Sequence, residues 1–157
     1  MRFHRTFGVA LVGLILGIGV AVFFARPVSA PGDDSSVVFG DGRLFLELAT
    51  STSTRERGLG LRDPLASDAA MLFVFPKDGS YAFWMKDMRF PIDIFWLNAD
   101  ARVVHIESSI APSTYPAAFQ SPTPARYVLE TNAGYAEHHH IQIGTTLELK
   151  NIPTVAP

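Results

Sequence analysis

Short apolar stretches separated by turn residues fill the chain from about residue 43 onward. Leucines occupy every second position from Leu44 to Leu48, and this period of two is typical of a β-strand with one buried face. Further strands are predicted at 71–75, 81–85, 92–97, 102–106, 126–131 and 145–150. Many short strands at regular spacing predict a mainly β domain, either an antiparallel two-layer sandwich or a barrel.

Capping and turn residues interrupt this pattern at three places. Ser53-Thr54-Arg55-Glu56 matches a capping box, which predicts one short helix that the glycines at 58 and 60 end. Asn98 to Ala101 predicts a tight turn between two strands. Four prolines from Pro112 to Pro124 predict a long loop, and such loops are often binding or lid segments, or disordered.

The beginning of the chain has a different pattern. Behind Arg2 and Arg5, the 19 residues at 7–25 carry no charged side chain, and as a helix they would span roughly 28 Å, close to the thickness of a bilayer core. This run predicts a signal peptide or a signal anchor with its basic end in the cytoplasm. Small residues at 28–32 offer cleavage sites, but the length of the run favours a retained anchor.

The sequence therefore predicts three parts. Residues 1–32 form the signal peptide or membrane anchor with the start of a linker, 33–42 form the rest of a Gly/Ser/Asp-rich linker, and 43–151 form a single β-rich domain. This order predicts a periplasmic domain, or one on the outer face of the cytoplasmic membrane. The membrane is then a partner through the apolar segment if that segment is not cleaved.

Charge and composition narrow the classes of function. The net charge is −2 for the whole chain, and 10 basic residues stand against 15 acidic ones after residue 32. No basic run survives there, which argues against nucleic acid as a partner. The chain has no cysteine, so the exported domain must rest on its core and not on disulfides.

Asp93 is the first candidate for a functional side chain. Strand alternation places residues 92, 94 and 96 on one face and Asp93 with residues 95 and 97 on the other. A carboxylate among apolar neighbours needs a hydrogen bond or an ion pair. We expect an ion pair or hydrogen bond with at least one of Lys86, Arg62 and Arg89. A structural ion pair or a carboxylate that binds a loop amide is the alternative to a functional polar pocket.

Glu130 is the second candidate. Alternation along 126–130 places Val128 and Glu130 on one face, with Tyr127 and Leu129 on the other. Because Glu130 precedes Thr131-Asn132, a solvated position at the end of a strand is the expectation that competes with a functional role.

Glu137-His138-His139-His140 is a possible metal-binding motif. In a strand, His138 and His140 would share a face, and His105 could approach from another strand; three imidazoles suit zinc, copper or nickel. Adjacent histidines in a polar turn are more often a solvated surface run, so we expect no metal site here. No cofactor is predicted either, since the glycines lack a phosphate-loop spacing and no catalytic nucleophile stands out.

Several segments carry a family resemblance. They are Arg57-Gly58-Leu59-Gly60-Leu61-Arg62, Met71-Leu72-Phe73-Val74-Phe75, Phe83-Trp84-Met85-Lys86, Pro91-Ile92-Asp93 and Tyr127-Val128-Leu129-Glu130. In this order the chain resembles domain of unknown function 192, an uncharacterised family, from about Leu44 to Lys150. It departs where the family usually has Asn-Thr, here Asp87-Met88, and where it usually has Gly-Leu-Met, here Gly58-Leu59-Gly60.

The resemblance implies a jelly-roll-like sandwich and brings no activity, cofactor or catalytic residue. The charged positions that match the family pattern are Arg62, Lys86, Asp93 and Glu130. Together with Trp84 they are the candidate pocket residues, and the catalytic residues are unknown.

Three functions remain open on the sequence. The leading hypothesis is a non-enzymatic envelope domain that binds a small molecule, a glycan or another envelope protein. It depends on aromatic residues that could be exposed, namely Tyr81, Trp84, Trp96 and Tyr115, although strands also bury such residues in cores. The alternatives are a hydrolase or lyase that uses Asp93 or Glu130 with a neighbouring Lys or Arg, and a structural partner in an envelope assembly.

Overall fold

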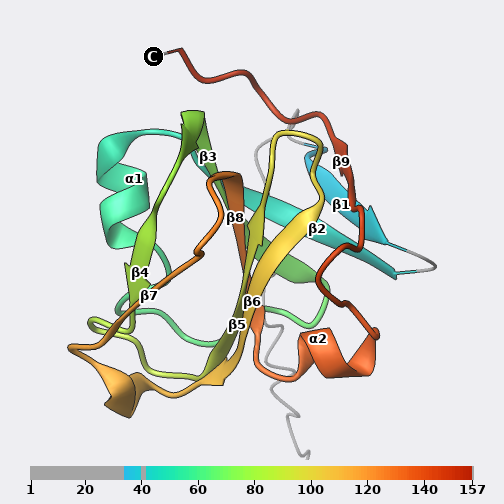
Figure 1. Ribbon diagram of the computed structural model, residues 1–157. Helices are drawn as coiled ribbons and strands as arrows, with labels where there is room; N and C mark the ends of the chain where they lie inside the picture. Colours follow the sequence, from blue (N-terminus) through green and yellow to red (C-terminus); the bar gives the residue numbers. More distant parts are fainter. Residues whose placement is uncertain (1–33, 40–41, 157) are drawn as a thin grey trace, which may run out of the picture. The chain divides into compact units, whose positions relative to one another are not determined.

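The computed structural model describes residues 34–39 and 42–156 of the chain (Figure 1). The anchor predicted at 1–32 lies outside these residues. Within the described ranges, no helix has the length and apolar character needed to cross a bilayer.

Strands account for most of the regular structure. The elements in chain order are β1 (Ser36–Phe39), β2 (Gly42–Ala49), α1 (Thr52–Arg57), β3 (Ala69–Gly79), β4 (Ala82–Trp84), β5 (Ile92–Leu97), β6 (Val103–Ile110), η1 (Pro112–Thr114), β7 (Ala118–Gln120), β8 (Ala125–Asn132), α2 (Tyr135–His138) and β9 (Glu148–Lys150). The prediction of a mainly β, sandwich-like or barrel-like fold is confirmed.

One large sheet organises the domain. Its strand order is β6-β5-β8-β3-β2-β1-β9, and β4 and β7 form a separate two-stranded sheet. All pairs in the large sheet are antiparallel except β2 and β3, which are parallel. The expectation of a purely antiparallel sheet was therefore wrong. Residues 50–68, including α1, form the crossover that a parallel pair requires.

The central strands bury both of their faces. On β3, Leu72 and Val74 belong to one hydrophobic cluster, whereas Met71 and Phe73 belong to the other. The six residues of β5 are all buried, and its five apolar residues alternate between the two clusters as predicted. The central strands of the large sheet are therefore covered on both sides. Figure 1 shows α1 near the β4–β7 pair and α2 on the opposite side of β5.

The first strand corrects the predicted linker. Ser36–Phe39 was assigned to the linker at 33–42, but it forms β1 and pairs with both β2 and β9. Val37 is completely buried in one of the two clusters. The strand could not be recognised from the sequence, because its apolar run is short and lies between polar residues, and a four-residue strand gives only a weak periodic signal.

The short elements differ from the predictions in detail. The capping box of α1 uses Ser51 and Thr54 and not Ser53 and Glu56: Ser51 Oγ accepts from Thr54 N at 3.2 Å, and Ser51 N donates to Thr54 Oγ1 at 3.0 Å. Helix α2 was not predicted. The predicted Pro-rich loop contains η1 and β7, and β7 pairs with β4. The turn after β5 is as predicted, since Asn98 Oδ1 accepts from the amide of residue 102 at 2.9 Å.

We expect the chain to fold on its own when residues 1–32 are deleted. The described residues from 34 onward form a compact unit, and the chain has no cysteine, so a reducing cytoplasm should not prevent folding. Residues 33–157 expressed there should give one species in gel filtration and one cooperative thermal transition. Aggregation, or a transition that needs the first 32 residues, would contradict the division into anchor and domain.

Candidate ligand-binding cavity

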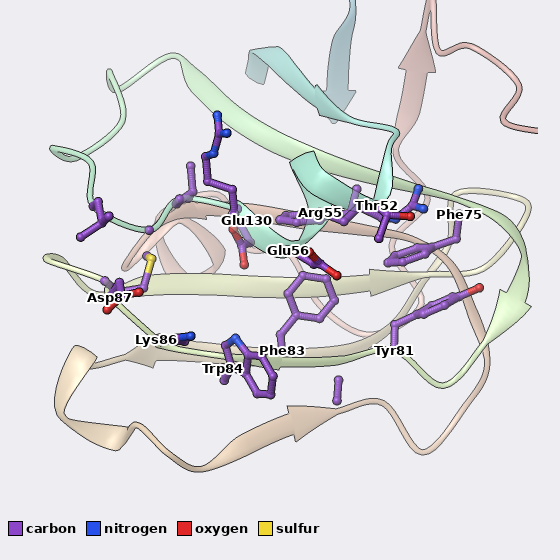
Figure 2. A pocket seen from close by; sticks show the side chains of 18 of the residues that line it. Thr52, Arg55, Glu56, Phe75, Tyr81, Phe83, Trp84, Lys86, Asp87 and Glu130 are labelled. Atoms are coloured by element: carbon purple, nitrogen blue, oxygen red, sulfur yellow. The ribbon is translucent and has the colours of Figure 1, made fainter.

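A cavity of about 640 Å³ lies between α1, β3, β4 and the turns that follow α1 and β4. Its aromatic lining residues are Phe73, Phe75, Tyr81, Phe83 and Trp84. Its charged lining residues are Arg55, Glu56, Arg57, Lys86, Asp87 and Glu130. Figure 2 shows the labelled residues of α1 and Glu130 on one side of this hollow, with Trp84 and Lys86 on the other.

Glu130 is the buried polar group of the cavity. It lies on β8, opposite Met71 of β3 and Ile94 of β5, and is only 5% exposed. Its Oε2 atom is buried and has no hydrogen-bond partner among the described residues. Burial raises the pKa of this carboxyl from 4.5 to about 8, because desolvation penalises the charged form. The expectation of a solvated strand end was wrong.

The aromatic wall is held in place by ring contacts. The Phe83 ring packs edge-on against Phe73 at 4.8 Å and against Trp96 at 5.9 Å between centroids. Trp96 is completely buried, and its Nε1 donates to the Tyr81 carbonyl at 3.0 Å. Trp84 differs from Trp96, because 57% of it is exposed. The cavity therefore offers one indole face to a ligand.

The cationic side chains of the cavity differ in the contacts that they make with the protein. Arg55 Nη1 donates to the carbonyls of Thr50 at 2.7 Å and Val74 at 3.0 Å, and its guanidinium lies 5.3 Å from the centroid of Phe75. Lys86 and Arg57 are exposed, and neither forms an ion pair with a described carboxylate. Arg55 serves the fold, whereas Lys86 and Arg57 remain available at the rim.

Two strained turns meet at the cavity. Leu61 and Asp87 have φ values of 60° and 59°, which are costly for residues with a Cβ. The Leu61 amide donates to the Asp87 carbonyl at 2.9 Å and ties the turns together. A Cβ on Gly60 would lie 3.1 Å from the Arg57 carbonyl and 3.5 Å from that of Lys86. The small residue at 60 therefore permits the close approach.

Asp93 lies outside the cavity and has a structural role. It is completely buried, and its carboxylate accepts from the amides of Ser109 at 2.7 Å, Gly134 at 3.1 Å and Ala136 at 2.8 Å. The expected bond to Lys86, Arg62 or Arg89 was wrong. Main-chain amides from two distant segments satisfy the charge instead, which is the loop-amide alternative.

The structure separates the five candidate pocket residues. Trp84, Lys86 and Glu130 line the cavity, whereas Arg62 and Asp93 do not. Arg62 makes a two-pronged ion pair with Glu47, with Nη1–Oε2 at 2.6 Å and Nη2–Oε1 at 2.7 Å.

The residues of α1 and the turn after it were missed as cavity residues. Arg55, Glu56 and Arg57 form part of the wall, and Leu61 lies exposed beside it. The family motif at 57–62 was the available signal. Sequence alone could not show that this motif faces β4.

The histidine run ends a helix and does not form a strand. His138 is the last residue of α2, and the His139 ring packs 4.2 Å from Tyr135 and 5.4 Å from Phe39 between centroids. The shared strand face considered for His138 and His140 was therefore wrong. Across the described part of the chain, no group of three or more His, Asp or Glu side chains is placed to hold a metal ion.

The seven-stranded mixed sheet with its small second sheet defines a mostly β domain of the open sandwich or barrel-like class. Two of the solved structures that match this chain are the following. A protein from Sinorhizobium meliloti 1021, described as a "putative transcription regulator", is 32% identical with a TM-score of 0.67, over 73% of this chain and 91% of that chain. A protein of unknown function from Novosphingobium aromaticivorans DSM 12444 is 26% identical with a TM-score of 0.69, over 80% and 94%.

The family model of DUF192, described as "Uncharacterized ACR", matches residues 37–149. The chain belongs to this family, as the motifs predicted. No curated protein matches it.

Proposed function

We propose that the domain binds a small organic ligand non-covalently in the cavity between α1 and β4. The observation that carries this proposal is Glu130, whose Oε2 is buried without a described partner in the cavity wall. A buried polar atom without a partner costs about 1–3 kcal/mol. A ligand that supplies the missing hydrogen bond would recover this free energy.

The shape and composition of the cavity support the same function. A volume of about 640 Å³ lies in the usual range of small-molecule sites, which combine apolar walls with a few polar groups. Trp84 and Leu61 are exposed by 57% and 67% and give the ligand an apolar surface to cover. Strain at Leu61 and Asp87 is also typical of binding sites.

The proposal places the domain outside the cytoplasmic membrane, attached through the apolar run at 7–25. The support is the sequence pattern of that run and its basic N-terminal flank. The excess of acidic residues after residue 32 makes a small ligand a better candidate than nucleic acid. This holds even though the Sinorhizobium relative is described as a "putative transcription regulator".

A second candidate is acid catalysis by Glu130. A carboxyl with a pKa of about 8 holds its proton at neutral pH and could act as a general acid, with Lys86 in the same cavity. Turnover that Glu130→Gln abolishes, while ligand binding persists, would establish this alternative. The hydrolase or lyase that uses Asp93 has no support, because Asp93 does not line the cavity and its carboxylate accepts from three main-chain amides.

Tryptophan fluorescence provides a test of binding. Trp84 is exposed in the cavity wall and Trp96 is fully buried, so a cavity ligand should change the emission of Trp84 alone. A screen of sugars, amines and carboxylic acids should yield a ligand that shifts the emission. At a hundred times its Kd it should stabilise the fold by about 2.7 kcal/mol.

Trp84→Phe is the matched control variant. It should abolish the change in emission while the ligand still raises the melting temperature, since Phe keeps an apolar ring in the wall. A ligand whose emission change survives Trp84→Phe binds elsewhere, and such a result for every hit would refute the proposed site.

A further inference from the structure

We infer that the group of the ligand that reaches Glu130 is an organic ammonium, held by the buried carboxylate and the aromatic wall beside it. This inference rests on the proposed function and names its ligand class. It concerns the buried end of the cavity, where Glu130 Oε2 has no hydrogen-bond partner among the described residues.

The first argument is that Glu130 has no cationic partner among the described residues. Three cations line the cavity with Glu130, yet none of them pairs with it. Arg55 is committed to two carbonyls and the Phe75 ring, and the other two cations, Arg57 and Lys86, are exposed to water. Glu130 holds its proton at neutral pH while the cavity is empty. It would release that proton to water when an ammonium enters, because a cation that also donates a hydrogen bond strongly stabilises a buried carboxylate. A ligand ammonium supplies both.

The second argument is the surrounding wall. Phe73, Phe83 and Trp84 line the same cavity, and Figure 2 shows Phe83 and Trp84 on the side of the hollow that faces Glu130. Aromatic faces attract cations through the ring quadrupole, and the attraction grows when water is removed. The wall therefore favours a cation over an anion of the same size.

Other head groups match the depth of the cavity less well. A hydroxyl could donate to Glu130 but would bring no charge, so its hydrogen bond is weaker than that of an ammonium. A carboxylate would lie against the carboxyl of Glu130 and the negative faces of the rings. Arg57 and Lys86 are exposed, so water screens their positive charges. Their repulsion therefore does not exclude a ligand ammonium from the buried end of the cavity.

Three probes with one ring and different head groups test the inference: benzylamine, benzyl alcohol and benzoate. The full chain in lipid nanodiscs, labelled at its methionine methyl groups, reports binding by NMR, with empty nanodiscs as the reference. Met88 lines the cavity and is the reporter of binding. The Met88 signal should move on titration. Benzylamine should bind about tenfold or more tightly than benzyl alcohol, and benzoate most weakly.

Two variants that each replace one carboxyl group of the lining by an amide complete the test. Glu130→Gln should weaken benzylamine about tenfold or more and leave benzyl alcohol within about twofold. Glu56→Gln removes an exposed carboxylate of the same cavity and should change benzylamine by less than about twofold. A cooperative thermal transition shows that each variant is folded.

The outcomes separate the inference from the proposed function. Equal binding of benzylamine and benzyl alcohol, or benzylamine binding that Glu130→Gln leaves intact, overturns the ammonium inference and keeps a small-molecule site. An unmoved Met88 signal with all three probes overturns both.

Discussion

Asp93→Ala should lower the free energy of unfolding by about 3–5 kcal/mol. The carboxylate is fully buried and accepts from three amides, two of which belong to Gly134 and Ala136 at the start of α2. Its removal leaves three buried or half-buried donors without an acceptor. Urea denaturation of the wild type and the variant measures the difference.

Asp93→Asn and Asp78→Ala are the controls. Asn can keep the oxygen that serves Ser109 and Gly134, but its NH₂ group would then face the amide of Ala136, so a loss of about 2–3 kcal/mol is expected. Asp78 pairs with Arg126 at 2.8 Å on an exposed surface, and its loss should cost less than about 1 kcal/mol. A cost for Asp93→Ala below that of Asp78→Ala would contradict the structural role.

Glu130 should make the fold less stable as the pH rises. Its pKa is 4.5 in the unfolded reference and about 8 in the fold, so between these values the unfolded chain has lost a proton that the folded chain retains. The free energy of unfolding should fall by roughly 3–4 kcal/mol from pH 5 to pH 8 through this group. The contribution is fully present below pH 4.5 and is lost as the pH approaches 8.

Glu130→Gln isolates the effect, because the amide does not titrate. The stability of this variant relative to the wild type should rise from pH 5 to pH 8 by the same amount. Glu56→Gln serves as the reference, since Glu56 is exposed, and its stability curve should run parallel to that of the wild type. Parallel curves for Glu130→Gln and the wild type would show that Glu130 is ionised in the folded chain.

Patterns among neighbouring residues correctly predicted the features of the fold that depend on neighbouring residues, such as strand faces and turns. Alternation assigned the five apolar residues of β5 to the correct face, because the direction of a side chain follows from its place in the strand. The turn at Asn98 depends on a bond to an amide four residues away, so its signal also lies within a few residues. The strand character of 36–39 was missed since the run is short.

Contacts between distant segments could not be predicted in this way. The amides on Asp93 come from residues 16, 41 and 43 positions further along the chain. Glu130 is buried because β3 and β5 flank it. The residues next to it in the sequence give no sign of this pairing. Trp84, Lys86 and Glu130 were singled out through the family motifs, but the cavity that they share depends on how α1 packs, which is not a local property.

The place of β1 has a mechanical consequence. This strand lies between β2 and β9, and the residues just before it are bound to the end of the chain: Ser35 Oγ donates to the Asn151 carbonyl at 2.9 Å, and Asn151 Nδ2 to that of Asp34 at 3.3 Å. Tension applied through the N-terminal segment would load strand pairs on both sides of β1 at once. A tether attached there would pull on an interior strand, so the domain should resist force better than one suspended from a free edge.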